Sequence, residues 1–260
     1  MSTKKINGFV ISNNEIEDNK NVVKVFSKEK GKTIFYALGV NKPESKNKFS
    51  VQLFSYSEFE LFESLKADGL SKLKTGVLKK DFNKITQSYE LYLFTATFTS
   101  LLDILFDNNF PDNETFKLLL FYFSEIESAI DKAFQLFVLV IFKLLKNTGA
   151  DWNLEECLIC KRRNSKFVRF DFAKKQFICI RCFDKKQKHP DSFIKMLLAF
   201  KGENLYSAYF MPWNIEDLVV LNSTLINYYN NDLGISIPAF KEIKTSKYIK
   251  LNKEAMKKYL

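Results

Sequence analysis

Residues 157–182 read CLICKRRNSKFVRFDFAKKQFICIRC, and they contain every cysteine of the chain. The cysteines form two pairs, Cys157 with Cys160 and Cys179 with Cys182, and eighteen residues separate the pairs. Two C-x2-C pairs at this separation are typical of a tetrahedral zinc site. Four thiolates complete the coordination of the ion, so the spacing predicts one structural Zn²⁺ with no open position for chemistry. The alternatives are buried free thiols or a redox C-x-x-C pair, but no thioredoxin-like βαβ pattern surrounds either pair.

Between the two cysteine pairs the sequence predicts a β-hairpin. Phe167, Phe170 and Phe172 occur among Val168, Arg169 and Asp171, in an alternation that is typical of a strand with one packed face. We therefore interpret residues 155–188 as a zinc knuckle with four cysteine ligands. Zinc thiolates are typical of a reducing compartment, where disulfides do not persist.

Basic charge is concentrated in three parts of the chain. The net charge is +10 overall, +5 over residues 1–50 and +9 over residues 161–189, and residues 241–260 are also basic. All four arginines lie in the knuckle, at Arg162, Arg163, Arg169 and Arg181. Since a guanidinium presents a planar fork to phosphate or carboxylate, this segregation predicts contact with a polyanion. The alternative is that these arginines form salt bridges to the acidic residues 51–160. From the knuckle we select four candidate DNA-binding residues: Arg162, Arg163, Lys166 and Arg169.

The N-terminal residues predict a small β-barrel. Short segments of alternating apolar and polar residues occur at 6–11, 21–26, 32–38, 50–62 and 71–78. Five short strands within about 80 residues favour a barrel of the OB type, which we assign to residues 1–80. Such barrels bind single strands through aromatic side chains and lysines, and here Phe26, Phe35, Tyr36 and Phe49 lie near lysines. We expect Phe26 and Phe35 to be core residues. Lysines on strand edges and in the 39–48 loop are expected to be exposed, and those selected as DNA-binding candidates are Lys24, Lys32, Lys42, Lys46 and Lys48.

After Asp81 the period of the apolar pattern changes from two residues to 3.6. One apolar face runs from Phe82 towards Leu105, a second helix begins near Pro111, and residues 131–146 are apolar almost all round. Further helices are expected after Pro190 and over residues 214–229. The predicted fold class is therefore α+β, with the five-stranded barrel followed by a helical domain, residues 81–260, that carries the inserted knuckle.

The sequence lacks the residues and motifs that several functional classes require. The one histidine, His189, stands between Lys188 and Pro190 and is expected to be an exposed turn residue, a poor position for catalysis. No P-loop and no H-x-E motif of a zinc deaminase is present, so the sequence predicts no enzyme. The longest apolar run, Leu136–Phe142, is far shorter than the ~20 residues of a membrane span. We expect a cytoplasmic protein with no membrane partner.

The ordered set of motifs resembles the RecO family of bacterial recombination mediators. The resemblance begins with Lys5-Ile6-Asn7-Gly8-Phe9-Val10-Ile11 and continues through residues 21–32. Residues 39–45 are similar to the family's Gly-x-basic-basic-Pro-basic-Ser loop, with Asn41 and Glu44 at two of its basic positions. The same order of motifs as in the family continues with residues 52–62, the helices ending at Gly149 and the cysteine quartet.

This resemblance implies a non-enzymatic mediator of DNA repair and recombination. Family members bind single- and double-stranded DNA and anneal complementary strands. The resemblance also implies that the chain works with RecR to load RecA onto DNA coated by single-strand binding protein. It further implies that the helical domain docks the C-terminal tail of that protein, and that the protein associates with the nucleoid.

A second hypothesis is that the chain is a protein-interaction module. In this interpretation the zinc-stabilised knuckle grips an acidic peptide and does not contact DNA directly. A third hypothesis, an enzyme acting on nucleic acid, lacks clustered carboxylates or histidines, because Asp171 and Asp184 are the only acids in residues 161–189.

Overall fold

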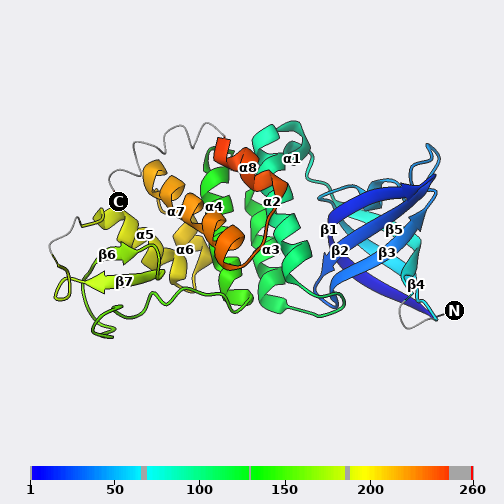
Figure 1. Ribbon diagram of the computed structural model, residues 1–260. Helices are drawn as coiled ribbons and strands as arrows, with labels where there is room; N and C mark the ends of the chain where they lie inside the picture. The colour runs from blue at the N-terminus through cyan, green and yellow to red at the C-terminus, as the bar shows by residue number, and fades with distance from the viewer. Residues whose placement is uncertain (1, 66–68, 129, 185–187, 246–258, 260) are drawn as a thin grey trace. The chain divides into compact units, whose positions relative to one another are not determined.

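The structure is a computed structural model, and it describes residues 2–65, 69–128, 130–184, 188–245 and 259 (Figure 1). The chain forms two compact units, Met1–Ile130 and Asp131–Leu260. Most of the basic stretch 241–260 lies outside the described residues, as does part of the knuckle, residues 185–187. None of the helices that the structure describes is both long and apolar enough to cross a membrane.

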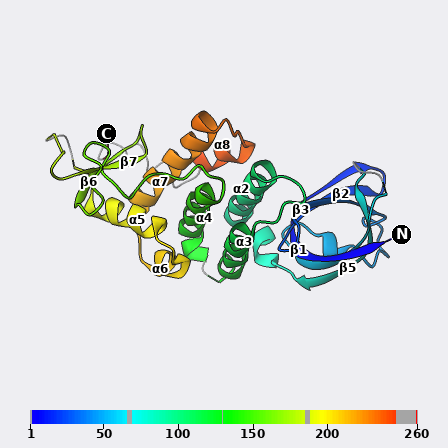
Figure 2. The ribbon, with the colours of Figure 1, turned by 90° about the horizontal axis from the view of Figure 1, so that it is seen from below.

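The first unit begins with a closed barrel whose strands are joined in the order β1-β2-β3-β5-β4. Its strands are β1 (Thr3–Glu17), β2 (Lys20–Ser27), β3 (Gly31–Leu38), β4 (Tyr56–Phe62) and β5 (Ser71–Lys80). Neighbouring strands are antiparallel except β3 and β5, which pair in parallel. Figure 2 shows the strands closing around the interior. The predicted five-stranded barrel of the OB type is confirmed.

Alternate residues of the strands fill the barrel. Val23 and Val25 of β2, Phe35 of β3 and Phe59 of β4 have no exposed surface, and they form one apolar cluster with Val10 of β1. Each inward side chain is followed by an outward one because successive residues of a strand point to opposite faces.

Two strand boundaries differ from the predicted ones. The first strand is longer than residues 6–11, since β1 pairs with β4 through one half and with β2 through the other, with a register shift between Val10 and Ser12. The fourth strand begins at Tyr56 and not near Ser50, because Phe49–Val51 form a 3-10 turn and Phe54 has a φ of 68°.

Helices complete the first unit. They are α1 (Asn83–Gln87), α2 (Tyr89–Leu105) and α3 (Asn113–Glu125). The apolar face expected to run on from Phe82 is divided between α1 and α2. The division falls at Ser88, which is extended and whose hydroxyl accepts a hydrogen bond from Leu91 N at 3.4 Å. Asp112 caps α3 in the same way, accepting from Thr115 N at 2.6 Å.

Aromatic rings join the barrel to these helices. On the outer face of β1, Phe9 stacks on Phe123 of α3 with ring centroids 4.4 Å apart, and Phe82 lies 6.1 Å from Phe9. On β2, Phe26 meets Phe106 edge to face at 5.6 Å. The expectation that Phe26 and Phe35 are core residues is confirmed. The barrel therefore presents an outer apolar face that α2 and α3 cover.

The turn into β3 also depends on the helical segment. Gly31 has a φ of +62°, and a Cβ placed there would lie 1.9 Å from the carbonyl oxygen of Phe110. Only glycine combines that backbone conformation with so close an approach.

The second unit consists of helices around one central helix. In chain order its elements are η2 (Ile130–Lys132), α4 (Ala133–Asn147), β6 (Phe167–Asp171), β7 (Gln176–Cys179), α5 (Asp191–Lys201), α6 (Leu205–Phe210), α7 (Ile215–Asn227), the π-helical turn η3 (Tyr228–Asp232) and α8 (Pro238–Thr245). Twelve residues of α4 are buried, so the helix predicted over 131–146 is the central one as expected. In the chain, the β6-β7 hairpin lies between α4 and α5 (Figure 1), and Cys179 is the last residue of β7.

Candidate metal centre and nucleic-acid interface

The four cysteine sulfurs converge on one point of the second unit. All four Sγ atoms lie within 4.8 Å of one another, and Cys160 Sγ is 3.8 Å from Cys179 Sγ. A tetrahedral ion with Zn–S bonds of about 2.3 Å has sulfur–sulfur edges of about 3.8 Å. The cluster therefore fits a single Zn²⁺ held by Cys157, Cys160, Cys179 and Cys182.

The hairpin brings the two cysteine pairs together. Leu158 N donates to Phe177 O at 2.7 Å, which attaches the first pair to β7. Cys179 ends β7, and its N–H donates to Cys157 Sγ at 3.4 Å. The predicted hairpin is confirmed, with Val168 and Phe170 buried on one face and Arg169 half-buried on the other.

Local hydrogen bonds favour sulfur in the thiolate form at one end of the cluster. Burial tends to raise the pKa of Cys157, but the backbone N–H groups of Cys160, Cys179 and Ile159 lower that pKa to about 6. Hydrogen bonding to Cys160, together with burial, raises the pKa of Cys182 to about 12. A divalent cation must displace the remaining protons, so its affinity should fall as the pH falls.

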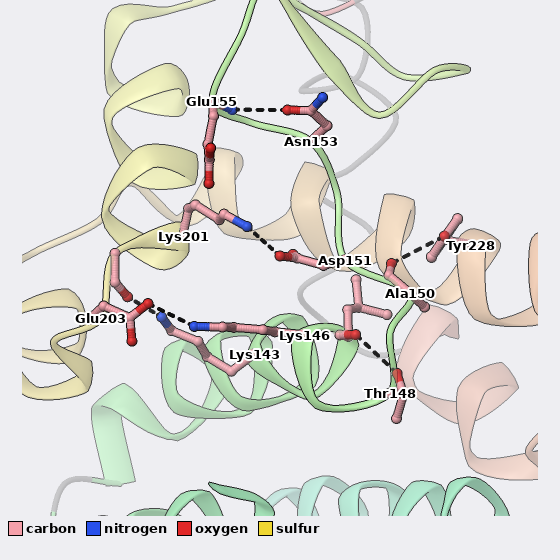
Figure 3. Close-up of polar contacts among 12 residues, drawn as sticks. Lys143, Lys146, Thr148, Ala150, Asp151, Asn153, Glu155, Lys201, Glu203 and Tyr228 are labelled. Atoms are coloured by element: carbon pink, nitrogen blue, oxygen red, sulfur yellow. Dashed lines mark hydrogen bonds and ion pairs between the residues drawn. The ribbon is translucent and has the colours of Figure 1, made fainter. Parts of the chain in front are cut away.

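Polar contacts fix the segment that leads from α4 to the first cysteine (Figure 3). Asp151 forms an ion pair with Lys201 of α5, and the hydroxyl of Tyr228 donates to Ala150 O at 3.2 Å. These contacts attach the start of the knuckle to the helices, so the cysteine cluster is held by the fold on the side of Cys157.

Most basic side chains of the knuckle are exposed. Of the predicted set, Arg162, Arg163 and Lys166 are exposed, while Arg169 is half-buried; Arg181 is also exposed. Cys157 N donates to Arg162 O at 3.0 Å, so the turn that places the thiolate also places this arginine. Within the part of the chain that the structure describes, the three exposed arginines form no ion pair with residues 51–160, which was the alternative interpretation. The charge of Arg169 acts on the neighbouring His189.

The position predicted for the one histidine is wrong. His189 is only 3% exposed, and it contacts strand β6 of the hairpin. Its Nδ1 accepts from Phe170 N at 3.1 Å, and its Nε2 donates to Tyr259 O at 3.0 Å. Burial, with a smaller effect of the Arg169 charge, lowers the pKa of His189 to about 4. The imidazole is therefore a neutral structural link between the hairpin and residue 259.

The lysine-rich loop of the barrel is exposed as predicted. Its three candidates are all exposed: Lys42, Lys46 and Lys48. Successive tight turns form the loop, and Asn47 Oδ1 accepts from Gly76 N of β5 at 2.9 Å. Phe49, which follows directly, is 57% exposed and can offer a ring for base stacking.

Two lysines of the barrel are not exposed as expected. Lys24 Nζ lies 2.6 Å from one carboxylate oxygen of Asp103 on α2, and Lys32 Nζ lies 3.4 Å from the other. Lys32 is only 8% exposed. The expectation of exposure failed because α2 covers this end of β2 and β3, and one carboxylate engages both ammonium groups. Neither lysine is presented to a phosphate in this arrangement.

Sequence reasoning also passed over Lys20. Its ammonium group lies 4.7 Å from the ring centroid of Tyr36, on the neighbouring strand, and 2.9 Å from Glu17. The pairing of β2 with β3 puts these residues together, and single-strand periodicity carries no signal for it.

Comparisons with known proteins agree along the chain. The family described as "Recombination protein O N terminal" matches residues 1–82, and "Recombination protein O C terminal" matches residues 86–239. The chain is 33% identical over 252 residues to the DNA repair protein RecO of Mesoplasma florum, a match that covers 95% of this chain and 93% of the relative. It is 27% identical over 233 residues to that of Mycoplasma capricolum, covering 89% and 93%. For Listeria innocua the identity is 26% over 201 residues, covering 75% and 76%.

Proposed function

The chain belongs to the RecO family of DNA repair proteins, and on this premise we propose that it is a non-enzymatic, DNA-binding recombination mediator. It binds single- and double-stranded DNA and anneals complementary strands. With RecR it helps to load RecA onto DNA coated by single-strand binding protein, whose C-terminal tail it docks. It acts in the cytoplasm, at the nucleoid.

One observation carries the proposal: two separate sets of basic side chains are free to meet phosphates. The loop lysines are Lys42, Lys46 and Lys48, and the knuckle set is Arg162, Arg163 and Lys166. Exposed Lys and Arg neutralise backbone phosphates and release counterions, which supplies affinity without sequence preference. This is what a mediator that must act on any sequence requires. Lys24 and Lys32 are left out of both sets because Asp103 pairs with them.

Zinc has a structural role in this proposal. Four thiolates leave no coordination position for water or substrate, so the ion fixes the knuckle, and the turn after the first cysteine pair presents Arg162 and Arg163. The half-buried Arg169 contributes from the outer face of β6.

The experiment that tests the proposal measures the affinity for a labelled single strand over a range of salt concentrations. Replacing Arg162, Arg163 and Lys166 by Ala should weaken binding at least about tenfold. It should also lower the slope of log affinity against log salt concentration by about 2 in magnitude, since each phosphate contact contributes ~0.7 to that slope for single strands. Replacing Lys42, Lys46 and Lys48 by Ala should act in the same direction. Annealing of complementary strands, with and without single-strand binding protein, should fall in parallel.

The matched control removes three positive charges elsewhere. Lys117, Lys195 and Lys241 are exposed and lie outside both sets, so their replacement by Ala should change affinity less than about threefold. Wild-type affinity that does not vary with salt would contradict the proposal.

The second candidate function is recognition of an acidic peptide by the knuckle alone. The exposed guanidinium groups of Arg162 and Arg163 favour it, because they pair with carboxylates as readily as with phosphates. If the knuckle variant loses an acidic-tail peptide and keeps full DNA affinity, this function replaces DNA contact at the knuckle.

A further inference from the structure

One end of the barrel interior is polar and open. The pocket there has a volume of about 440 Å³, within the ~300–1,000 Å³ of small-ligand sites. Its lining includes Lys4, Lys30, Thr33, Glu63, Ser71 and Asn109. We call it the barrel-end pocket.

Strand alternation explains why polar groups point into this pocket. Lys4 lies two residues before the buried Ile6 on β1, and Thr33 two residues before the buried Phe35 on β3. Residues two apart on a strand share a face, so both side chains continue the inward-facing columns of the barrel. The apolar core therefore ends beneath a layer of polar groups.

A hydroxyl in this layer has no hydrogen-bond partner among the described residues. Thr33 is only 8% exposed, and no described group bonds to its Oγ1. A buried polar atom left unpaired is unfavourable, so this hydroxyl gains a partner if its side chain turns toward a ligand in the pocket that Thr33 lines.

The charges at the pocket point to an anion. Lys4 and Lys30 both line the pocket, and the amino group of Lys30, with burial, lowers the pKa of Lys4. Glu63 raises that pKa, but its carboxylate already accepts a hydrogen bond from Ser2 Oγ at 2.9 Å. Two cations and one anion leave a positive balance, and an anion between the lysines relieves their repulsion.

We propose that the barrel-end pocket binds a phosphate group of a nucleic-acid strand, held by Lys4, Lys30 and the hydroxyl of Thr33. The identity of the ligand as nucleic acid rests on the proposed function, whereas phosphate binding itself does not. An end phosphate and an internal phosphate of the strand share this chemistry.

The test uses the full chain and a double variant, Lys4→Gln with Lys30→Gln. The matched control is Lys5→Gln with Lys28→Gln, because Lys5 and Lys28 lie on the same strand and the same turn but are exposed outside the pocket. Inorganic phosphate is titrated first, with the amide signal of Thr33 as the readout. We expect the double variant to bind phosphate about tenfold more weakly than the wild type and the control, as loss of charge-assisted hydrogen bonds implies.

The second arm uses two oligonucleotides that differ only in a 5′-phosphate or a 5′-hydroxyl. Preference for the phosphorylated strand, lost in the double variant, identifies the end phosphate as the ligand. If the two strands bind with equal affinity, and the slope of log affinity against log salt concentration falls by about 0.7 in magnitude in the double variant alone, the ligand is an internal phosphate.

A third variant covers the case in which the lysine changes prevent folding. Thr33→Val keeps the shape of the side chain and removes only the unpaired hydroxyl, so the thermal midpoint should hold while phosphate affinity falls. If both pocket variants bind phosphate and DNA as tightly as the control does, the proposal that the pocket binds phosphate is wrong, even if the wild type binds DNA. A wild type that binds phosphate at this pocket but no DNA overturns the proposed function and leaves the pocket standing.

Discussion

At the scale of single residues, Asp103 determines what two barrel lysines can do. Its carboxylate pairs with both Lys24 and Lys32, so two positive charges that look free in the sequence are engaged by one acid. Half-buried ion pairs of this kind resist screening by salt better than exposed ones. Of the five barrel lysines predicted to bind DNA, those that remain accessible are Lys42, Lys46 and Lys48 of the 39–48 loop.

Gly31 and Gly149 provide a matched pair for measuring close approach. Both have positive φ, +62° and +72°, but only at Gly31 would a Cβ meet another atom, the Phe110 carbonyl oxygen at 1.9 Å. Gly149→Ala should cost about 1–2 kcal/mol for the left-handed backbone alone. Gly31→Ala should cost about 2–5 kcal/mol, because the chain must also shift. Urea unfolding of the two variants measures the difference, and equal costs would show that the contact with Phe110 is unimportant.

His189 makes stability depend on pH in a defined window. Its pKa falls from about 6.5 in the unfolded chain to about 4 in the folded one, so the folded state resists protonation. The resulting stability is fully present above pH ~6.5 and is lost as the pH falls towards ~4, by about 2–3 kcal/mol. Proton NMR of this one histidine reports the folded pKa directly.

A control separates His189 from the carboxylates that titrate in the same range. His189→Gln keeps a hydrogen-bonding side chain and removes the titration, so its stability should vary less between pH ~6.5 and ~4.5. A measured pKa near ~6.5 in the folded protein would mean that the ring is not buried.

The role of a residue could be predicted where it depends on spacing in the sequence, and not where it depends on burial by segments distant in the chain. The cysteine quartet was predictable because its spacing alone restricts the geometry. The burial of His189 was not, since residue 259, far along the chain, supplies its partner. Lys4 and Thr33 were missed for a related reason: their inward direction follows from strand register, which becomes certain only once the barrel closes.

At the scale of elements, the knuckle joins a short hairpin to a cluster of four cysteines that fits a metal ion. Two short strands, β6 and β7, make only a small ladder, and a two-stranded hairpin is marginal in water. We expect about one zinc per chain in protein purified under reducing conditions. Removal by a chelator should lower the thermal stability of the second unit and leave the barrel transition unchanged.

Metal analysis and a paired variant check this expectation. Cys160→Ser with Cys182→Ser should abolish zinc retention, whereas Ser165→Ala, in the same knuckle, should keep it. Wild-type protein that contains no zinc would show that the cysteines are simply reduced thiols.

Element type was easier to predict than element boundaries. The central helix α4 follows from a long run of residues that is apolar almost all round, the hairpin follows from an alternation of apolar and polar residues, and both are present. The division between α1 and α2 was not predicted, because the apolar face continues in register across Ser88 while the backbone there is extended. A capping serine inside an apolar pattern is a local signal for the start of a helix, and a prediction based on periodicity alone does not detect it.

At the scale of the whole molecule, two divisions of the chain coexist. The change of period near residue 81 matches the border between the two family models, at 82 and 86. The compact units divide instead at residue 130, because α2 and α3 pack on the barrel through Phe9 and Phe26. Sequence periodicity detects where strands end, whereas packing decides which elements unfold together.

This packing predicts how fragments behave. A fragment of residues 1–130 should unfold cooperatively, whereas a fragment of residues 1–82 should be less stable by several kcal/mol, since it exposes Phe9 and Phe26. Circular dichroism on heating, with binding of a hydrophobic dye, compares the two fragments. Equal midpoints would show that the helices contribute nothing to the barrel.

The distribution of the cysteines has a practical consequence for labelling. All four lie in the second unit and converge as candidate metal ligands, while residues 1–130 contain none. A single cysteine introduced in the barrel, for example Ser45→Cys beside the loop lysines, would then be the one thiol open to a maleimide fluorophore once zinc occupies the others. The dye would report on the binding of a strand to the barrel in the intact protein. No native cysteine would have to be replaced to prevent background labelling.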